Sequence, residues 1–410
     1  MKILQVLDFI VYWSVIIMPF SVAISPAIAN TSIGLFSGAF LISRLLKPKR
    51  ISIDKTILVS FLCLIIFALL SFLNSVSYKA SIQGIAKLLK FLLIFVVCSQ
   101  GIKDRKHIIK IVFSICCGVS LSAVDAFWQF LFGYDFIHNV ALHINIGLPR
   151  SSAAFPNPNL LGIYMSAFIP LIAGLTLFYF KGKDKAGMFF LSTLALGGIF
   201  LTFSRGAGLA VYLAILFLLI ISKKKLLIAI WISIILIFPF VMPKDIKKWA
   251  KEVNYNPMVF MLNQDRISIY NNTINMIKHH PFVGIGVNTF SKNYGKYKTE
   301  SAENYAHTPD TIYAHNIYLQ MAGEIGLLGL AAFIWFLFLI FRNIADNYFS
   351  LNDDFLRATA LSLSAGMIAF LINGLTETSL YNSRVAMIFW YLIGMSLSLN
   401  KFNGRAAKEP

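Results

Sequence analysis

The chain has 410 residues, of which 58% are hydrophobic and only 13% are charged, with a formal net charge of +18. Soluble domains are far more polar than this, whereas a helix that crosses a bilayer needs about 20 mostly apolar residues. The composition therefore excludes an ordinary soluble domain and indicates a polytopic membrane protein.

Twelve apolar segments follow one another along the chain. They lie at 9–28, 31–46, 56–74, 84–100, 108–132, 159–180, 187–203, 207–221, 225–242, 314–341, 356–376 and 383–399. Strands of a membrane barrel would be shorter and would alternate polar and apolar residues, which these segments do not. The sequence predicts an all-α membrane protein. Residues 1–242 hold the first nine helices, 243–313 a large loop, 314–400 the last three helices, and 401–410 a tail.

The positive charge is concentrated in every second loop. Its members are Arg44, Lys47, Lys49, Arg50, Lys55, Lys103, Arg105, Lys106, Lys110, Lys181, Lys183, Lys185, Lys223, Lys224, Lys225, Arg342 and Arg357. The positive-inside rule places these loops, and with them both termini, in the cytoplasm. Topology and contact with anionic lipids then account for the net charge, so we expect no nucleic-acid partner.

The first apolar segment allows two interpretations. Ala27-Ile28-Ala29 follows an apolar stretch as a signal-peptide cleavage site would. However, the stretch contains Pro19 and Pro26 and is longer than the apolar part of a signal peptide, so we expect a retained first helix. Cleavage would leave the topology of the remaining chain unchanged.

The four cysteines all fall inside expected helices, at positions 63, 98, 116 and 117. None of them has metal-ligand spacing with a histidine. We therefore expect neither a disulfide framework nor a metal site.

Two connections on the opposite, outer face are long, at 133–158 and 243–313, and loops of this length are usually functional or form their own subdomain. Within the second, Arg266–Lys278 has helix-like apolar spacing, and Pro281, Gly284 and Gly286 predict a stop and a turn. His279 and His280 would then lie at a helix C-terminus, where a cation is favoured.

An arginine is expected at the tip of a tight outer hairpin. Lysines flank residues 187–221 on both sides, so the chain must turn back at Ser204-Arg205-Gly206. Each arm of about 15 residues spans roughly 24 Å, slightly less than a hydrocarbon core of about 30 Å. Arg205 would either snorkel to the surface or meet an anion such as phosphate, which suits its planar donor fork.

Three stretches occur in a recognisable order: "TFSRGAGL" at 202–209, "DRISIYNNTINMIKHHPFVGIGVNTF" at 265–290 and "AHNIYLQMAGEIGLLGL" at 314–330. Together with "FPNPNLLGIYM" at 155–165 and the loop plan, they resemble the O-antigen ligase and polymerase superfamily, most closely the ligases. The resemblance implies a GT-C-like fold and a glycan donor on undecaprenyl pyrophosphate. For a ligase it implies a lipid A-core acceptor and a periplasmic active site in the bacterial inner membrane, with no cofactor.

The resemblance also implies roles for individual residues. It places the hairpin arginine at Arg205, followed by Leu209, and the arginine of the loop helix at Arg266, both as ligands of the pyrophosphate. It places the catalytic histidine at His315, with Gly323 in the family's spacing. The chemistry agrees, because arginines stabilise a departing diphosphate and imidazole is the side chain best suited to deprotonate a hydroxyl near neutral pH.

Other polar residues at the outer face are supporting candidates. Tyr313 and Asn316 flank His315, and Arg150, Glu377 and Arg384 are candidates for contacts with glycan or lipid headgroups. If His315 were not the base, His307 would be the next residue to consider.

Three functions are open at this point. A ligase and a polymerase of the same superfamily share donor chemistry and differ in the acceptor. A transporter of a polyanionic lipid is the third, but transporters tend to have inverted repeats and a midplane site, and this chain has no convincing repeat.

Overall fold

The computed structural model describes residues 2–145, 148–241, 247–248, 251–252, 257–298 and 312–403. The chain is almost entirely helical apart from one short hairpin. The helices are α1 (Lys2–Ile24), α2 (Pro26–Leu46), α3 (Lys55–Leu70), α4 (Tyr78–Gly101), α5 (Arg105–Phe132), α6 (Pro158–Phe178), α7 (Gly182–Phe200), α8 (Arg205–Ser222), α9 (Lys225–Val241), α11 (Pro257–His279), α12 (Phe290–Asn293), α13 (Ile317–Ser350), α14 (Asp354–Asn373) and α15 (Ser383–Ser398). The strands β1 (His143–Asn145) and β2 (Leu148–Arg150) pair antiparallel.

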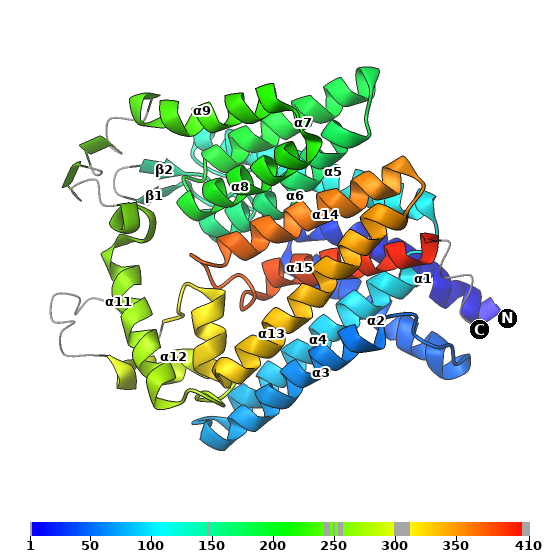
Figure 1. Cartoon of the computed structure of the whole chain (residues 1–410), viewed down its shortest axis with the longest axis horizontal. Helices are drawn as coiled ribbons and strands as arrows, with labels where there is room; N and C mark the ends of the chain where they lie inside the picture. The colour runs from blue at the N-terminus through cyan, green and yellow to red at the C-terminus, as the bar shows by residue number, and fades with distance from the viewer. Residues whose placement is uncertain are drawn as a thin grey trace.

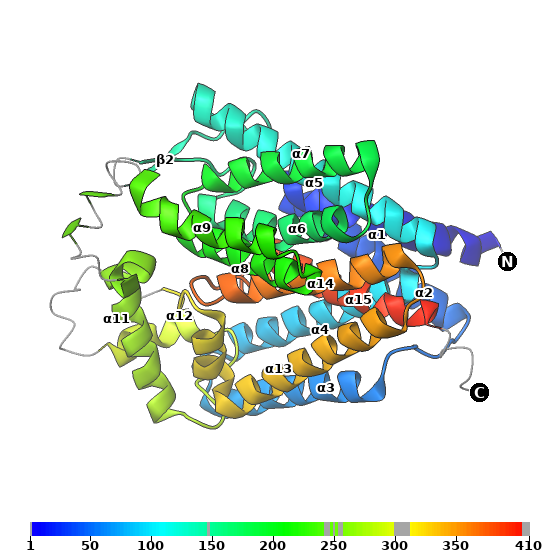
Figure 2. The same cartoon turned by 45° about the horizontal axis from the view of Figure 1, so that its top comes forward.

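The long helices form one bundle whose two ends differ. The N-terminus and the last residues of the chain that are described lie at the same end, whereas α11, α12, β1 and β2 lie at the other (Figure 1). The second view shows the same separation (Figure 2). We call the end with α11 and the β hairpin the distal end.

All twelve expected apolar segments coincide with helices, and the all-α polytopic membrane fold is confirmed. Within the described residues, ten helices are long and apolar enough to cross a membrane. The helix α7 is not among them, because three of its first four residues are charged, and the apolar part of α9 is shorter. Twelve spans were expected, so the difference lies in these two helices.

The centre of the bundle is α6, which is buried along most of its length between α14 and α8. On the other side, α13 packs on α3 and α15 packs on α4. Contacts of α14 with α13 and of α15 with α6 join the two sides, so the distal ends of α6, α8, α13 and α15 lie together. The segments that precede these four helices therefore meet in one place.

The helix α13 is broken at Gly326, which has φ 76° and ψ 174°. A side chain there would collide with the backbone of Phe282 and Val283, so the close approach requires glycine. Backbone hydrogen bonds join the same turn to α13, from Ile285 N to Gly323 O and from Leu327 N to Pro281 O. The break thus holds the turn after α11 against α13.

The helix expected over Arg266–Lys278 is confirmed as part of α11, which ends at His279 as predicted. Its inner side packs into a small separate core formed by Ile269, Met276, Ile285, Phe290, Tyr294 and Ala314. This core joins α11 and α12 to the residues just before α13. It therefore fixes the position of α11 above the distal end of the bundle.

Candidate active site

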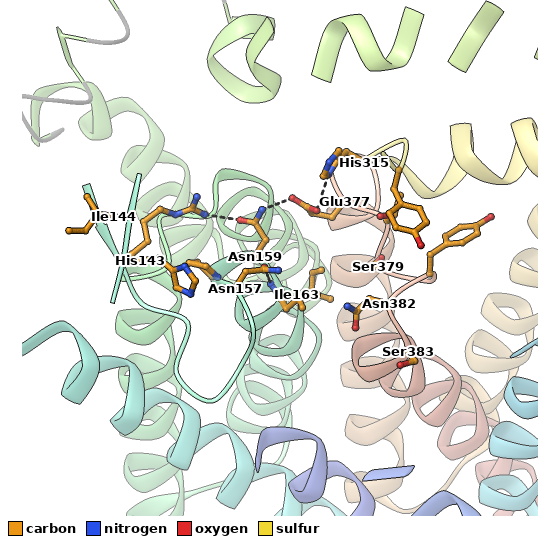
Figure 3. A pocket seen from close by; sticks show the side chains of 16 residues that line it. His143, Ile144, Asn157, Asn159, Ile163, His315, Glu377, Ser379, Asn382 and Ser383 are labelled. Atoms are coloured by element: carbon orange, nitrogen blue, oxygen red, sulfur yellow. Dashed lines mark hydrogen bonds and ion pairs between the residues drawn. The ribbon is translucent and has the colours of Figure 1, made fainter. Parts of the chain in front are cut away.

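A cavity of about 630 Å³ opens at the distal end, and Figure 3 shows it from close by. Its walls come from β1 and β2, the start of α6, the segment before α13 and the connection between α14 and α15. The lining residues are mostly polar: His143, Arg150, Asn157, Asn159, Tyr313, His315, Glu377, Thr378, Ser379, Tyr381, Asn382 and Ser383, with Ile144, Pro158, Leu160 and Ile163. Such a lining suits a ligand rich in hydroxyl or phosphate oxygens.

Three helices begin around this cavity, and an asparagine caps each of them. Asn157 Oδ1 accepts a hydrogen bond from Leu160 N in α6, Asn316 caps α13, and Asn382 Oδ1 accepts from Arg384 N in α15. A helix N-terminus carries a partial positive charge and favours an anion nearby. The helix starts therefore make this end of the bundle electropositive.

A chain of polar contacts crosses the cavity wall from Arg150 to His315. Figure 3 shows its part from Asn159 through Glu377 to His315. Arg150 Nη2 donates to Asn159 Oδ1 at 2.7 Å, and Asn159 Nδ2 donates to Glu377 Oε1 at 2.7 Å. His315 Nδ1 lies 3.4 Å from Glu377 Oε2. Glu377 is thus the centre of the network, with one carboxylate oxygen toward Asn159 and the other toward His315.

Arg266 of α11 completes the network through an ion pair with Glu377 Oε1. The exposed fractions of the two side chains are 17% and 13%, so the pair is mostly removed from solvent. Burial alone would raise the pKa of Glu377, but the hydrogen bond to His315 and the charge of Arg266 outweigh it and lower the pKa. Glu377 is therefore a carboxylate at neutral pH.

The backbone of His315 is held in an unusual conformation, with φ 48°. For a residue with a Cβ atom, the left-handed region costs about 1–2 kcal/mol. The hydroxyl of Tyr270 donates to His315 O at 3.0 Å, and Ile317 N donates to Gly374 O at 2.8 Å, so both sides of His315 are anchored. Burial raises the pKa of Tyr270 to about 12, so the phenol keeps the proton that it donates.

Arg205 is the first residue of α8, at the same end of the bundle. The next residue, Gly206, approaches Thr376 so closely that an added Cβ would lie 2.1 Å from Thr376 Oγ1. The start of α8 is therefore packed against the residue that precedes Glu377. The charge of Arg205 interacts with those of Arg266 and Arg150, so three guanidinium groups share this region.

The family model described as O-antigen ligase matches residues 190–334. This match supports the assignment of the chain to the O-antigen ligase and polymerase superfamily. Comparison with curated proteins gives no match. The match and the ten apolar helices among the described residues support a multi-pass membrane enzyme of a family that acts on lipid-linked glycans.

The matched region contains Arg205, Arg266 and His315 but ends before Glu377. The structure brings Arg266, His315, Glu377 and Arg150 into one network, and it places the start of α8 beside them. Of the other candidates, Tyr313 lines the cavity, whereas Asn316 caps α13 and donates to Leu375 O. His307 lies outside the described residues.

The prediction for Arg384 was wrong. It was expected to face outward, but its exposed fraction is only 4%. Its guanidinium donates to the carbonyl oxygens of Val22, Ala23 and Ala154 and lies 3.8 Å from the ring centroid of Phe155. Every nitrogen of the group is engaged with the backbone of neighbouring segments. Arg384 therefore joins α15 to α1 and does not line the cavity.

Several residues that line the cavity have no role that the sequence predicts. These are His143, Thr378, Ser379, Asn382 and Ser383. The only signal for most of them is the polarity of "TETSLYNS" at 376–383, a short connection between two apolar helices. His143 gave no signal at all, because its place opposite Arg150 depends on the pairing of β1 with β2.

Proposed function

We propose that this protein is an O-antigen ligase that transfers a glycan from undecaprenyl pyrophosphate to lipid A-core. One observation carries the proposal: His315 and Arg266 meet at a single carboxylate beside a polar cavity at one end of a membrane-spanning bundle. That end would face the periplasm. The basic loops and both termini would then lie in the cytoplasm of a bacterium, with the bundle in the inner membrane.

Arg205 and Arg266 are assigned to the donor pyrophosphate. Two guanidinium groups that interact with each other, and with Arg150, favour a ligand that carries at least two negative charges. A diphosphate satisfies this requirement, and the three helix N-termini add to the same field. As the reaction proceeds, these groups would stabilise the charge on the leaving lipid pyrophosphate.

His315 is assigned to proton acceptance. Its ring nitrogen Nε2 takes the proton of the acceptor hydroxyl while the hydroxyl oxygen forms a bond to the anomeric carbon of the donor. The bond from that carbon to the phosphate oxygen breaks at the same time, and the lipid pyrophosphate leaves as an anion. One direct displacement inverts the anomeric centre and requires no enzyme nucleophile. The side chain of His315 is 32% exposed, which leaves it accessible to an acceptor.

The cavity suits the two sugars that must meet there. Its volume of about 630 Å³ lies within the usual range for small-molecule sites, about 300–1,000 Å³. Asparagine, serine and threonine side chains along its wall match the hydroxyl groups of a glycan. A transporter is less well supported, since the polar network lies at one end of the bundle and not at the middle of the membrane.

A polymerase remains the second candidate, because it would use the same donor and leaving group. The lipopolysaccharide gel pattern of a deletion strain separates the two functions. Loss of all capped chains is expected for a ligase, whereas cores that carry one repeat unit would indicate a polymerase. Purified protein with undecaprenyl-pyrophosphate-linked glycan and lipid A-core then tests transfer directly.

A further inference from the structure

Glu377 is shared by the two parts of the site that have different tasks. Its Oε1 atom accepts from Arg266, which is assigned to the pyrophosphate, and from Asn159. Its Oε2 atom faces Nδ1 of His315, which is assigned to proton acceptance. A single carboxylate thus connects the donor-binding group to the base.

The two partners make competing demands on this carboxylate. A full negative charge beside an imidazole stabilises the protonated ring and so strengthens it as a base. Arg266 on the same carboxylate offsets its negative charge and so weakens its effect on the imidazole. Glu377 serves both groups in the structure, so His315 receives only part of the effect of the carboxylate.

We propose that Glu377 is a positioning residue that couples donor binding to proton acceptance by His315. The inference rests on the proposed function. When the donor pyrophosphate binds, it draws Arg266 away from Glu377, and the carboxylate is then left to His315. Nδ1 keeps its proton and donates a hydrogen bond to Glu377 Oε2, so Nε2 is free to take the proton of the acceptor hydroxyl. After the product has left, Nε2 of His315 releases the proton of the acceptor hydroxyl to solvent.

The surroundings of Glu377 are consistent with such an exchange. The charged or titratable groups that face it are Arg266 and Tyr270 from α11, Arg150 from β2 and His315 from the segment before α13. Arg150 reaches it only through Asn159, and it also donates to Thr202 O at 2.8 Å. Arg150 and Asn159 line the cavity, whereas Arg266 comes from α11, which does not, so a diphosphate that draws Arg266 away from Glu377 leaves the cavity wall in place.

The test is Glu377→Gln in the full-length protein reconstituted in vesicles. Glutamine has the shape of glutamate and can still accept a hydrogen bond from His315, but it has no charge. We expect kcat to fall about 10- to 100-fold, as for other groups that orient a functional histidine. Binding of undecaprenyl pyrophosphate should tighten by a few fold, because its competitor for Arg266 is gone. The acid limb of the rate profile should also move to lower pH.

Two further variants complete the test. Asp346→Asn removes an exposed carboxylate at the other end of the bundle and should change none of these quantities. Glu377→Asp keeps the charge on a shorter side chain and serves if the glutamine variant does not fold. We expect it to lose rate, because it reaches only one of the two partners, and to bind undecaprenyl pyrophosphate at least as well as wild type.

The opposite results are equally clear. If binding of undecaprenyl pyrophosphate weakens in parallel with kcat, Glu377 holds the site together and the coupling is refuted. An unmoved acid limb refutes it as well. Wild-type protein that transfers no glycan refutes the proposed function itself, whereas an active wild type with an unaltered glutamine variant refutes only the role of Glu377.

Discussion

Two mostly buried arginines show how differently this protein uses the same side chain. Arg384 lies within the bundle, where three backbone carbonyl oxygens and the ring of Phe155 surround its guanidinium. Arg266 lies at the distal end, where its partner is Glu377, a side chain that is already shared with His315 and Asn159. Backbone carbonyl oxygens hold Arg384 in place. Arg266 pairs with a carboxylate, which another anion can replace.

This difference decides what each group is able to do. Val22 and Ala23 lie in the last turn of α1, and Ala154 lies in a turn before α6. Their buried carbonyl oxygens would lose their partner without Arg384, so its hydrogen bonds persist and join α15 to α1. A carboxylate beside a polar cavity does have alternatives, because a phosphate can replace it at Arg266. The comparison assigns stability to Arg384 and function to the network around Glu377.

The largest expected effect comes from the functional region. His315→Ala should lower glycan transfer by about 10²–10⁴-fold, the usual contribution of a general base. The protein should still insert into the membrane and bind undecaprenyl pyrophosphate, because donor binding is assigned to the arginines. A reconstituted assay with purified donor and acceptor measures both quantities. Near wild-type transfer would show that the base lies elsewhere, and loss of donor binding would make His315 a phosphate ligand.

The next effect tests the structural side of the comparison. Arg384→Met removes the partner of three buried carbonyl oxygens, and each unsatisfied group costs about 1–3 kcal/mol. We expect a marked fall in the thermal stability of the purified protein and in its accumulation in the membrane. Arg357→Met is the matched control, since Arg357 also lies over a ring, that of Tyr348, but donates to one carbonyl oxygen only. Equal stability of the two variants would contradict the assignment.

Substitutions that keep the positive charge test whether the arginines bind the diphosphate through their planar guanidinium groups. Arg205→Lys and Arg266→Lys keep a cation but lose the planar fork that binds a diphosphate with two parallel hydrogen bonds. Each should weaken donor binding and transfer by roughly 10-fold, which corresponds to about 1.4 kcal/mol, with little effect on thermal stability. Binding of undecaprenyl pyrophosphate and initial rates measure the loss. Full activity of both lysine variants would make them ordinary surface residues.

The sequence predicted the bundle well, because a membrane allows few alternatives to apolar helices of spanning length. The order of three motifs predicted Arg205, Arg266 and His315 as site residues, and the structure places Arg266 and His315 in one network. The partners of Glu377 could not be found in this way, since its ion pair with Arg266 spans 111 positions in the chain and depends on how α11 packs. Arg384 was expected to contact glycan or lipid headgroups at the outer face. Its contact with Val22 spans 362 positions, which no local pattern reveals.

The smallest expected effect is a difference in how the contacts of the two arginines make thermal stability depend on pH. The pKa of Glu377 is lowered in the folded protein, so the unfolded chain takes up a proton at this position first as the pH falls. The stabilisation by its partners is therefore complete above the ordinary glutamate pKa of about 4.3, and it is lost as the pH falls through the lowered value. Thermal unfolding of the purified protein between neutral pH and the acid range measures this.

Wild type should accordingly lose more stability on acidification than Glu377→Gln, whose side chain does not titrate. Arg384→Met should keep the slope of the wild type, because the backbone carbonyl oxygens that bind Arg384 do not titrate either. Parallel curves for wild type and the glutamine variant would mean that the charge of Glu377 contributes nothing to the folded state. The exchangeable partner of Arg266 would then have to be sought in another residue of the cavity.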